Sequence, residues 1–407
     1  MHLLSNIIKA TLVLMSIQPA VAQVTVGADV LIHDCLDLVK GKRVAVVTNQ
    51  TARLSTGEHL VDALRKNGVN VVCVFGPEHG IRGFSAPGEQ VSDSLDVAAG
   101  IPVVSLYGKV NKPTPEMLKN IDVLLYDIQD VGARFYTFIS TMVLAMEAAA
   151  ECDLPFIVLD RPNPLGGNLV DGPVLEDSLK SFVGMVTVPV VYGMTCGELA
   201  QFVNGEGMLA GGIKAKLTVV PLKGWLRKMS WRDTGLPWNP PSPNMPSPGT
   251  ATVYPATCFF EATNLSEGRG TSRPFHIVGA PFIDAIRLAK RVNSLDLKGV
   301  QFDTVTFVPT SSKYQGMICR GISLNVTDPT RFEPVRTGLA LLREVRRLCR
   351  GSLTLNRRWF VKLMGSQGTY EGLIRGASIR SIVATWEFKL DRFKEVRKTY
   401  LLYGSDG

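Results

Sequence analysis

Short apolar runs alternate with amphipathic segments over the first half of the chain. Residues 71–75 (VVCVF) form one such run, bounded by Gly76 and Pro77, and are typical of a strand buried on both faces of a parallel sheet. The same pattern predicts further strands at residues 44–48, 102–106, 123–126, 156–159 and 188–192. It predicts helices at residues 57–66, from 114, at 135–151 and from 195. Because helices separate the strands, we expect right-handed βαβ units and an α/β fold with a Rossmann-like, doubly wound parallel sheet.

A proline-rich stretch follows this pattern. Residues 237–248 contain six prolines, which cannot continue a helix or a central strand, so we predict an extended connection. Trp238 and Asn244 would be unusual in a plain spacer, and the stretch either links two domains or lines a cleft between them. Beyond it the pattern predicts helices at residues 283–292, at 336–348 and from 390. It predicts strands near Val305 and Ile322.

At 407 residues the chain is long enough for two domains. We place a Rossmann-like catalytic domain at residues 23–245 and a second, C-terminal α/β domain at residues 246–407. The active-site cleft is expected between the two.

The first 22 residues predict a secretory signal peptide. Lys9 precedes the apolar residues 11–17, and residues 20–22 (AVA) have the small-x-small pattern of a cleavage site. We expect cleavage after Ala22 and a periplasmic or secreted protein; a disordered or buried N-terminal helix is the alternative. No other segment is an unbroken apolar run long enough to span a membrane, so no stable membrane insertion is expected.

Composition changes this picture mainly by what it excludes. The formal net charge of +8 favours anionic ligands, but the chain has no zinc-finger spacing and no dense basic run, so we expect no nucleic-acid partner. Seven cysteines without a C-x-x-C pair and only five histidines argue against a disulfide framework and against a metal site. The phosphate-binding G-x-G-x-x-G is absent after the first strand, and we expect no cofactor.

Polar side chains follow most of the predicted strands. The carboxyl ends of parallel strands meet at one edge of the sheet, where ligands bind in such folds. We therefore expect a rim suited to a polyhydroxylated ligand, made by Asn49, Glu78, His79, Arg82, Tyr107, Asp127, Gln129, Asp130, Asp160, Arg161 and Asn163. Glu78 is the candidate general acid, because partial desolvation after an apolar strand favours a protonated carboxyl; a turn or helix-cap carboxylate is the alternative.

Several rim residues keep two interpretations. His79 orients Glu78 or ligates a metal ion. Arg82 clamps a ligand carboxylate or forms an ion pair with Asp127 or Asp130. The same two aspartates either supply a second carboxylate for cleavage of a glycosidic bond or cap the helix predicted from residue 135.

The helix start and the second domain add further candidates. Arg134 and Tyr136 open the helix predicted from residue 135 and face the cleft, unless Tyr136 is buried in the helix packing. A cleft between the domains would also bring four second-domain residues opposite Glu78, unless they only build a structured turn. They are Glu261, Asn264, Glu267 and Arg269.

Several stretches resemble the exo-β-N-acetylmuramidase family that trims peptidoglycan fragments. The resemblance runs in order from about residue 27 to the C-terminus and rests on residues 76–80 (GPEHG), 105–108 (SLYG), 112–117 (KPTPEM), 127–137 (DIQDVGARFYT), 160–164 (DRPNP) and 267–271 (EGRGT). It implies release of terminal, β-linked N-acetylmuramic acid (MurNAc) from the non-reducing end of cell-wall glycans, and MurNAc-GlcNAc saccharides as ligands. The family's catalytic glutamate maps onto Glu78, and its tyrosine onto Tyr136, with Tyr107 and Tyr126 as competitors.

The resemblance agrees with the rim deduced from the residues. The anionic lactyl group of muramic acid requires an arginine, which Arg82, Arg134 or Arg269 could supply. The 2-acetamido group could act as an internal nucleophile while Glu78 protonates the leaving oxygen. A non-catalytic muropeptide- or sugar-binding protein is the alternative from another class, and a metal-dependent hydrolase is a third possibility.

Overall fold

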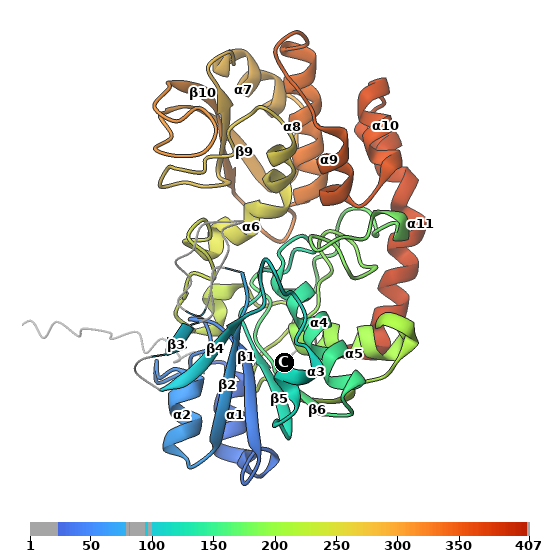
Figure 1. Cartoon of the computed structure of the whole chain (residues 1–407). Helices are drawn as coiled ribbons and strands as arrows, with labels where there is room; N and C mark the ends of the chain where they lie inside the picture. The colour runs from blue at the N-terminus through green and yellow to red at the C-terminus, as the bar shows by residue number, and fades with distance from the viewer. Residues whose placement is uncertain (1–22, 79–80, 82–93, 97–99, 405–407) are drawn as a thin grey trace, which may run out of the picture.

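The computed structural model describes residues 23–78, 81, 94–96 and 100–404, and it confirms the expected α/β class. The first domain, blue to green in Figure 1, is built on a seven-stranded sheet, and the second domain, yellow to red, lies beyond the carboxyl edge of that sheet. The strands of the first sheet are β1 (Arg43–Thr48), β2 (Asn70–Gly76), β3 (Ser94–Asp96), β4 (Ile101–Ser105), β5 (Val123–Asp127), β6 (Pro155–Leu159) and β7 (Lys216–Val220).

The strand order is β3-β4-β2-β1-β5-β6-β7. β3 pairs antiparallel with β4, and the other neighbours pair in parallel. Without β3 the chain order of the strands is 3-2-1-4-5-6, the order of doubly wound Rossmann folds. The register pairs Thr48 with Asp127 and Gly76 with Ser105, so the polar segments that follow these strands emerge along one edge.

Helices cover both faces of this sheet because side chains alternate along each strand. Val44 and Val46 of β1 pack in one core with α1 (Gly27–Asp34) and α2 (Leu60–Lys66). Ala45 and Val47 belong to the opposite core. That second core includes side chains of α3 (Pro115–Leu118), α4 (Phe138–Glu151) and α5 (Cys196–Gly205) and continues into the second domain.

The second domain contains a three-stranded antiparallel sheet in the order β8-β10-β9. Its elements are α6 (Pro248–Thr257), β8 (Ile277–Ala280), α7 (Ala285–Asn293), β9 (Val300–Phe307), β10 (Cys319–Val326), α8 (Pro334–Leu348), α9 (Arg357–Met364), α10 (Gln367–Arg375) and α11 (Ile379–Arg397). Helices α7 and α8 contact each other, and α8 also packs on α6.

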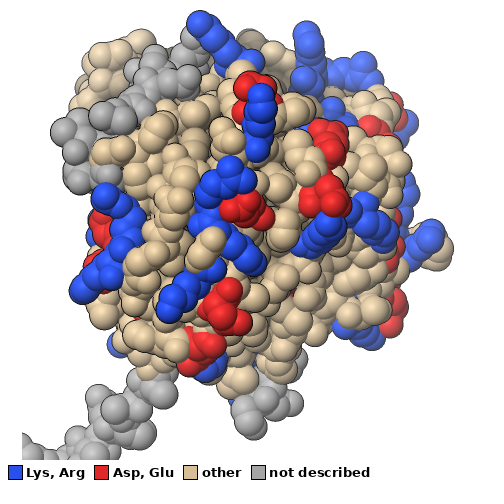
Figure 2. Space-filling view, turned by 60° about the horizontal axis from the view of Figure 1, so that its bottom comes forward, with Lys and Arg blue, Asp and Glu red and all other residues tan. Residues whose placement is uncertain are grey.

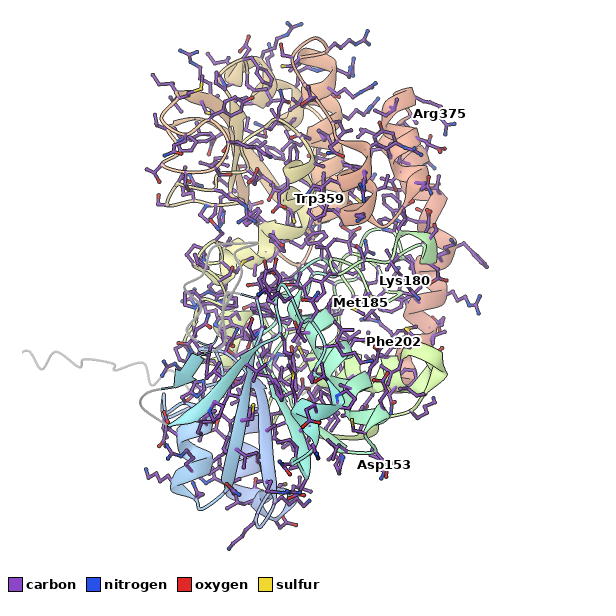
Figure 3. The ribbon with its side chains drawn as sticks, viewed as in Figure 1. Asp153, Lys180, Met185, Phe202, Trp359 and Arg375 are labelled. Atoms are coloured by element: carbon purple, nitrogen blue, oxygen red, sulfur yellow. The ribbon has the colours of Figure 1, made fainter. Side chains whose placement is uncertain are left out.

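The last helix returns to the first domain. In Figure 1, α11 runs down from the second domain alongside α5. Phe202 of α5, labelled in Figure 3, packs edge-to-face against Phe393 of α11 and against Tyr400. The ring centroids are 5.5 and 5.4 Å apart. The hydroxyl of Tyr403 then donates to Asp160 Oδ2 at the end of β6. The C-terminal segment therefore joins the two domains.

The structure corrects the predictions for residues 188–192 and 237–248. Residues 188–192 form only isolated bridges at Val191, and the strand beside β6 is β7 instead. The apolar run at 188–192 is buried among loops, whereas β7 is an edge strand with alternating exposure and has the weaker signal. The extended stretch also ends earlier than predicted, because Pro248 occupies the first turn of α6, where proline is tolerated, and Ser247 caps that helix.

The surface agrees with the mixed charge pattern of the sequence. On the face shown in Figure 2, lysine and arginine side chains are interspersed with aspartate and glutamate and do not form one basic stripe. In the part of the chain that the structure describes, no helix combines the length and apolar character needed to cross a bilayer.

Candidate active site

Glu78 lies two residues beyond the end of β2, at the carboxyl edge of the sheet. It is half-buried. Its Oε2 accepts a hydrogen bond of 2.6 Å from the hydroxyl of Thr137. The carboxyl of Glu78 is therefore held by a neighbour and is still within reach of solvent.

Thr137 occupies the N-cap position of α4 but does not cap it. A threonine at this position ordinarily accepts a hydrogen bond from the backbone of the first turn and has extended dihedral angles. Here φ is −71° and ψ is −9°, no side-chain cap bond forms, and the hydroxyl is directed to Glu78. Between Val123 and Val143, Thr137 is the one residue that is not buried. The loop before α4 thus presents this hydroxyl at the surface of an otherwise enclosed segment.

Tyr107 contacts the same carboxyl from the end of β4. Burial, the charge of Glu78 and a hydrogen bond to it raise the pKa of Tyr107 to about 12. Its ring lies 6.0 Å from that of Phe182, centroid to centroid. Two hydroxyl groups from different elements, one after β4 and one before α4, therefore converge on Glu78.

Tyr136 is packed against the second domain. Its ring meets Tyr254 of α6 edge-to-face at 5.8 Å and Phe138 at 4.9 Å. Burial raises the pKa of its hydroxyl well above the usual value, and the charges of Asp130 and Glu78 add to this shift. The Tyr136 hydroxyl is buried, and its interaction with Ser242 partly opposes this shift. Its ring is thus buried in the packing, while its hydroxyl lies in the electrostatic field of Glu78.

The second domain contributes a compact ion-pair cluster. Arg269 pairs with Glu261 at 2.7 Å and with Glu267 at 3.3 Å, and Lys313 pairs with Glu267 at 3.0 Å. Arg269 also lies over the ring of Phe275, 5.0 Å from its centroid. The charge of Arg269 lowers the pKa of Tyr136. The ion-pair cluster therefore lies close enough to Tyr136 to act on it electrostatically.

Asp127 forms a buried ion pair with Arg161. Asp127 is 0% exposed and Arg161 is 6% exposed. The guanidinium donates through Nε to Oδ1 and through Nη2 to Oδ2, the latter at 2.9 Å. Both carboxylate oxygens are therefore occupied by one arginine from the next strand end, and Asp127 does not cap α4.

Asp130 is enclosed in a different way. Its Oδ2 accepts hydrogen bonds from the Tyr192 hydroxyl and from Gly132 N, whereas Oδ1 is buried without a partner among the described residues. Burial raises the pKa of Asp130 to about 6. Asp130 does not cap α4 either, since the N-cap of that helix has no side-chain bond.

Other rim residues are also used within the protein. Asn49 accepts from Thr51, Gln129 donates to Pro162 O, and Asn163 donates to Met194 O. Gln129 and Arg161 line, with Thr51 and Pro237, a cavity of about 20 Å³, which is room for about one water molecule.

Arg134 lies in the interior. It is 0% exposed, and its guanidinium donates to the carbonyl oxygens of Pro173, Val188 and Leu363. We therefore assign Arg134 a structural place instead of the cleft-facing one expected from the sequence. The prediction for Arg134 is wrong because it assumes a helix from residue 135. The helix α4 begins at Phe138, so residue 134 lies in the loop before it.

The remaining candidates are placed as follows. Asn264 holds the loop at residues 352–354 through bonds to Ser352 O and Thr354 N, and Asn244 is half-buried in the proline-rich stretch. His79 and Arg82 lie outside the described residues. The proline-rich stretch does line the carboxyl edge, since Gln50 donates to Pro240 O.

Sequence reasoning did not single out Thr137, and it missed the pairing of Arg161 with Asp127. A signal for Thr137 exists, because a threonine directly before an apolar helix is an N-cap pattern. No sequence signal shows that the hydroxyl is directed elsewhere. Lys313, which lies 46 residues beyond Glu267 in the chain, had no signal either.

Two protein-family descriptions together match almost the whole chain. The family description "Exo-beta-N-acetylmuramidase NamZ, N-terminal" matches residues 44–249, and its C-terminal counterpart matches residues 252–403. The chain belongs to the exo-β-N-acetylmuramidase NamZ family. This confirms the family inferred from the motifs of the sequence.

Individual relatives are similar to the chain over nearly its whole length. The chain is 47% identical over 383 residues to the peptidoglycan beta-N-acetylmuramidase NamZ of Bacillus subtilis (strain 168), covering 94% of this chain and 92% of that protein. Two crystal structures of DUF1343 family proteins from Bacteroides fragilis NCTC 9343 share the fold. The first has a TM-score of 0.88 at 38% identity, covering 94% of this chain and 99% of the other; the second has 0.78 at 35%, covering 95% and 100%.

Proposed function

We propose that the protein is an exo-acting glycoside hydrolase that releases terminal, β-linked MurNAc from the non-reducing end of peptidoglycan fragments such as MurNAc-GlcNAc saccharides. The family and the B. subtilis relative support this substrate. The observation that carries the catalytic part is the carboxyl of Glu78, half-buried at the sheet edge and bonded by Thr137 at 2.6 Å. In the described rim, Asp127 is closed off by Arg161, so Glu78 is the better candidate for proton transfer.

In the proposed mechanism, Glu78 gives its proton to the glycosidic oxygen as the bond from that oxygen to the anomeric carbon breaks. The bonding electron pair leaves with the oxygen of the aglycone. The carbonyl oxygen of the substrate's own 2-acetamido group attacks the anomeric carbon and closes a ring. Water then adds to the anomeric carbon, one of its protons goes back to Glu78, and the ring opens to restore the 2-acetamido group. This route needs one protein carboxyl at the leaving oxygen, in keeping with substrate-assisted glycosidases.

The first test uses a synthetic β-glycoside of MurNAc with a chromogenic leaving group that still requires a proton. Wild type should release the chromophore, and Glu78→Gln should lower kcat by about 10²–10⁴-fold, because it removes the transferable proton. Binding of the saccharide by the variant should persist in calorimetry. A protein that only binds sugars would release no chromophore in either form, which would overturn the proposal.

A second measurement tests the route. Proton NMR of the first-formed product should show the β-anomer, since attack by the acetamido oxygen followed by water retains configuration. Initial appearance of the α-anomer would exclude the acetamido route and leave the hydrolase assignment standing.

We also propose that the protein acts in the periplasm or outside the cell. This rests on the signal-peptide pattern of residues 1–22, which lie outside the described residues. N-terminal sequencing of protein recovered from the extracytoplasmic fraction should begin at Gln23. An intact N-terminus on cytoplasmic protein would contradict the proposal.

A further inference from the structure

We infer that Thr137, assisted by Tyr107, is a positioning residue that holds the Glu78 carboxyl in the orientation from which it transfers its proton. This inference rests on the proposed function, because it concerns the proton that Glu78 transfers. Neither residue is taken to touch the substrate.

The geometry around Thr137 is the first support. A side chain at a helix N-cap contributes about 0.5–2 kcal/mol when it caps the helix. Thr137 does not form this cap bond and has helical dihedral angles. Its hydroxyl donates to Glu78 Oε2 instead. Among the described residues, five α-helices have an N-cap threonine or serine that does bond the first turn, at Thr114, Thr195, Ser247, Ser366 and Ser378, so the deviation at residue 137 is specific to this position.

The hydrogen bond itself is the second support. The Thr137 hydroxyl donates to Glu78 Oε2 over 2.6 Å. A bond at this oxygen limits rotation of the carboxyl group, so the group that transfers the proton is held in one orientation.

The electrostatic surroundings are the third support. The carboxyl is linked through Thr137 to the N-terminus of α4, where the helix dipole favours negative charge. Among the described residues, Tyr107 and Tyr136 are the titratable groups whose pKa responds to Glu78. Donated hydrogen bonds and a helix N-terminus stabilise the carboxylate that forms when Glu78 gives up its proton.

The test is the pH dependence of kcat for Thr137→Val. Valine keeps the shape of threonine but removes a donor that favours ionised Glu78, so the alkaline limb of the profile should move to higher pH by about one unit. We expect kcat at the optimum to fall by about 10-fold and KM to change less than about 2-fold, since a misoriented carboxyl affects transfer more than binding. Thr137→Ser should restore both the limb and the rate.

Tyr107→Phe should move the alkaline limb of the pH profile in the same direction by a smaller amount. This variant tests the inference if Thr137→Val does not fold. Thr114→Val is the matched control, because it removes an N-cap threonine that only caps α3. It should leave the profile unchanged. An unmoved alkaline limb in both Thr137→Val and Tyr107→Phe, with Glu78→Gln inactive, would overturn this inference alone. Full activity of Glu78→Gln would instead remove the proposed function on which it rests.

Discussion

The carboxyl edge of the large sheet has two parts that differ in how their polar groups are held. At the ends of β2 and β4, Glu78 and Tyr107 are half-buried and meet Thr137 from the loop before α4; we call this set the open half. At the ends of β5 and β6, Asp127 and Arg161 are buried and bonded to each other; we call this pair, with its buried neighbours, the closed half.

A polar residue at a strand end is therefore not yet a site residue. In the closed half, strand neighbours supply each other's partners, and the cavity that remains holds about one water molecule. The open half keeps a carboxyl whose partners are hydroxyl groups, which can exchange with a ligand hydroxyl at little cost. We therefore expect substitutions in the open half to change catalysis and those in the closed half to change stability.

The largest expected effect in the closed half comes from Asp127→Asn. The substitution leaves the buried guanidinium of Arg161 without its counter-charge, and breaking such a pair costs about 3–5 kcal/mol. Chemical denaturation should show this loss in the free energy of unfolding. Glu78→Gln, which changes a half-buried carboxyl in the same way, should change the free energy of unfolding by less than about 1 kcal/mol. Equal losses from both would remove the distinction between the halves.

Gly132→Ala tests the backbone of the closed half. Gly132 has a φ of +77°, and an added Cβ would lie 2.3 Å from Asn163 Oδ1. The unfavourable φ and the overlap together should lower the free energy of unfolding by about 2–4 kcal/mol. Gly68→Ala, also at positive φ but with open space around it, should cost less. A Gly132→Ala protein as stable as Gly68→Ala would show that Asn163 moves aside without penalty.

Much of this architecture is predictable from the sequence, because parallel strands buried on both faces leave continuous apolar runs. Five strand positions follow from that signal, and the polar residues after them mark the correct edge. The edge strand β7 and the strand β8 leave weaker patterns and were missed. The run at 188–192 was misassigned because an apolar segment among buried loops reads like a strand.

The site is less predictable for a physical reason. The sequence shows which side chains reach the edge but not which of them have already found partners there. Asp127 and Glu78 look alike in the sequence, each a carboxylate that follows an apolar strand. They differ because Arg161, 34 positions away from Asp127, comes from a neighbouring strand end. The role of Thr137 depends likewise on a contact 59 positions distant.

Asp130→Asn tests the closed half through the pH dependence of its stability. Burial raises the pKa of Asp130 to about 6, above the value of about 3.9 expected in the unfolded chain. A group whose pKa is raised by folding contributes stability at low pH that is lost as pH rises through the folded value. Between pH 4.5 and 7, the stability of the variant relative to wild type should therefore improve by about 2 kcal/mol. The difference between two denaturation series isolates Asp130 from other buried carboxyls. A difference that does not vary with pH would contradict the shift.

The smallest expected effect tests how the C-terminal segment supports the closed half. The Tyr403 hydroxyl donates to Asp160 Oδ2 and accepts from Leu222 N, and its ring meets Trp225 edge-to-face at 5.1 Å. Tyr403→Phe keeps the ring and removes both hydrogen bonds, so the free energy of unfolding should fall by about 0.5–2 kcal/mol while KM for the chromogenic substrate stays unchanged. Tyr400→Phe is the matched control, because its bond to Glu206 is exposed and its loss should cost less. A change in KM for Tyr403→Phe would mean that the end of β6 is coupled to the open half, and that the two halves of the edge do not act separately.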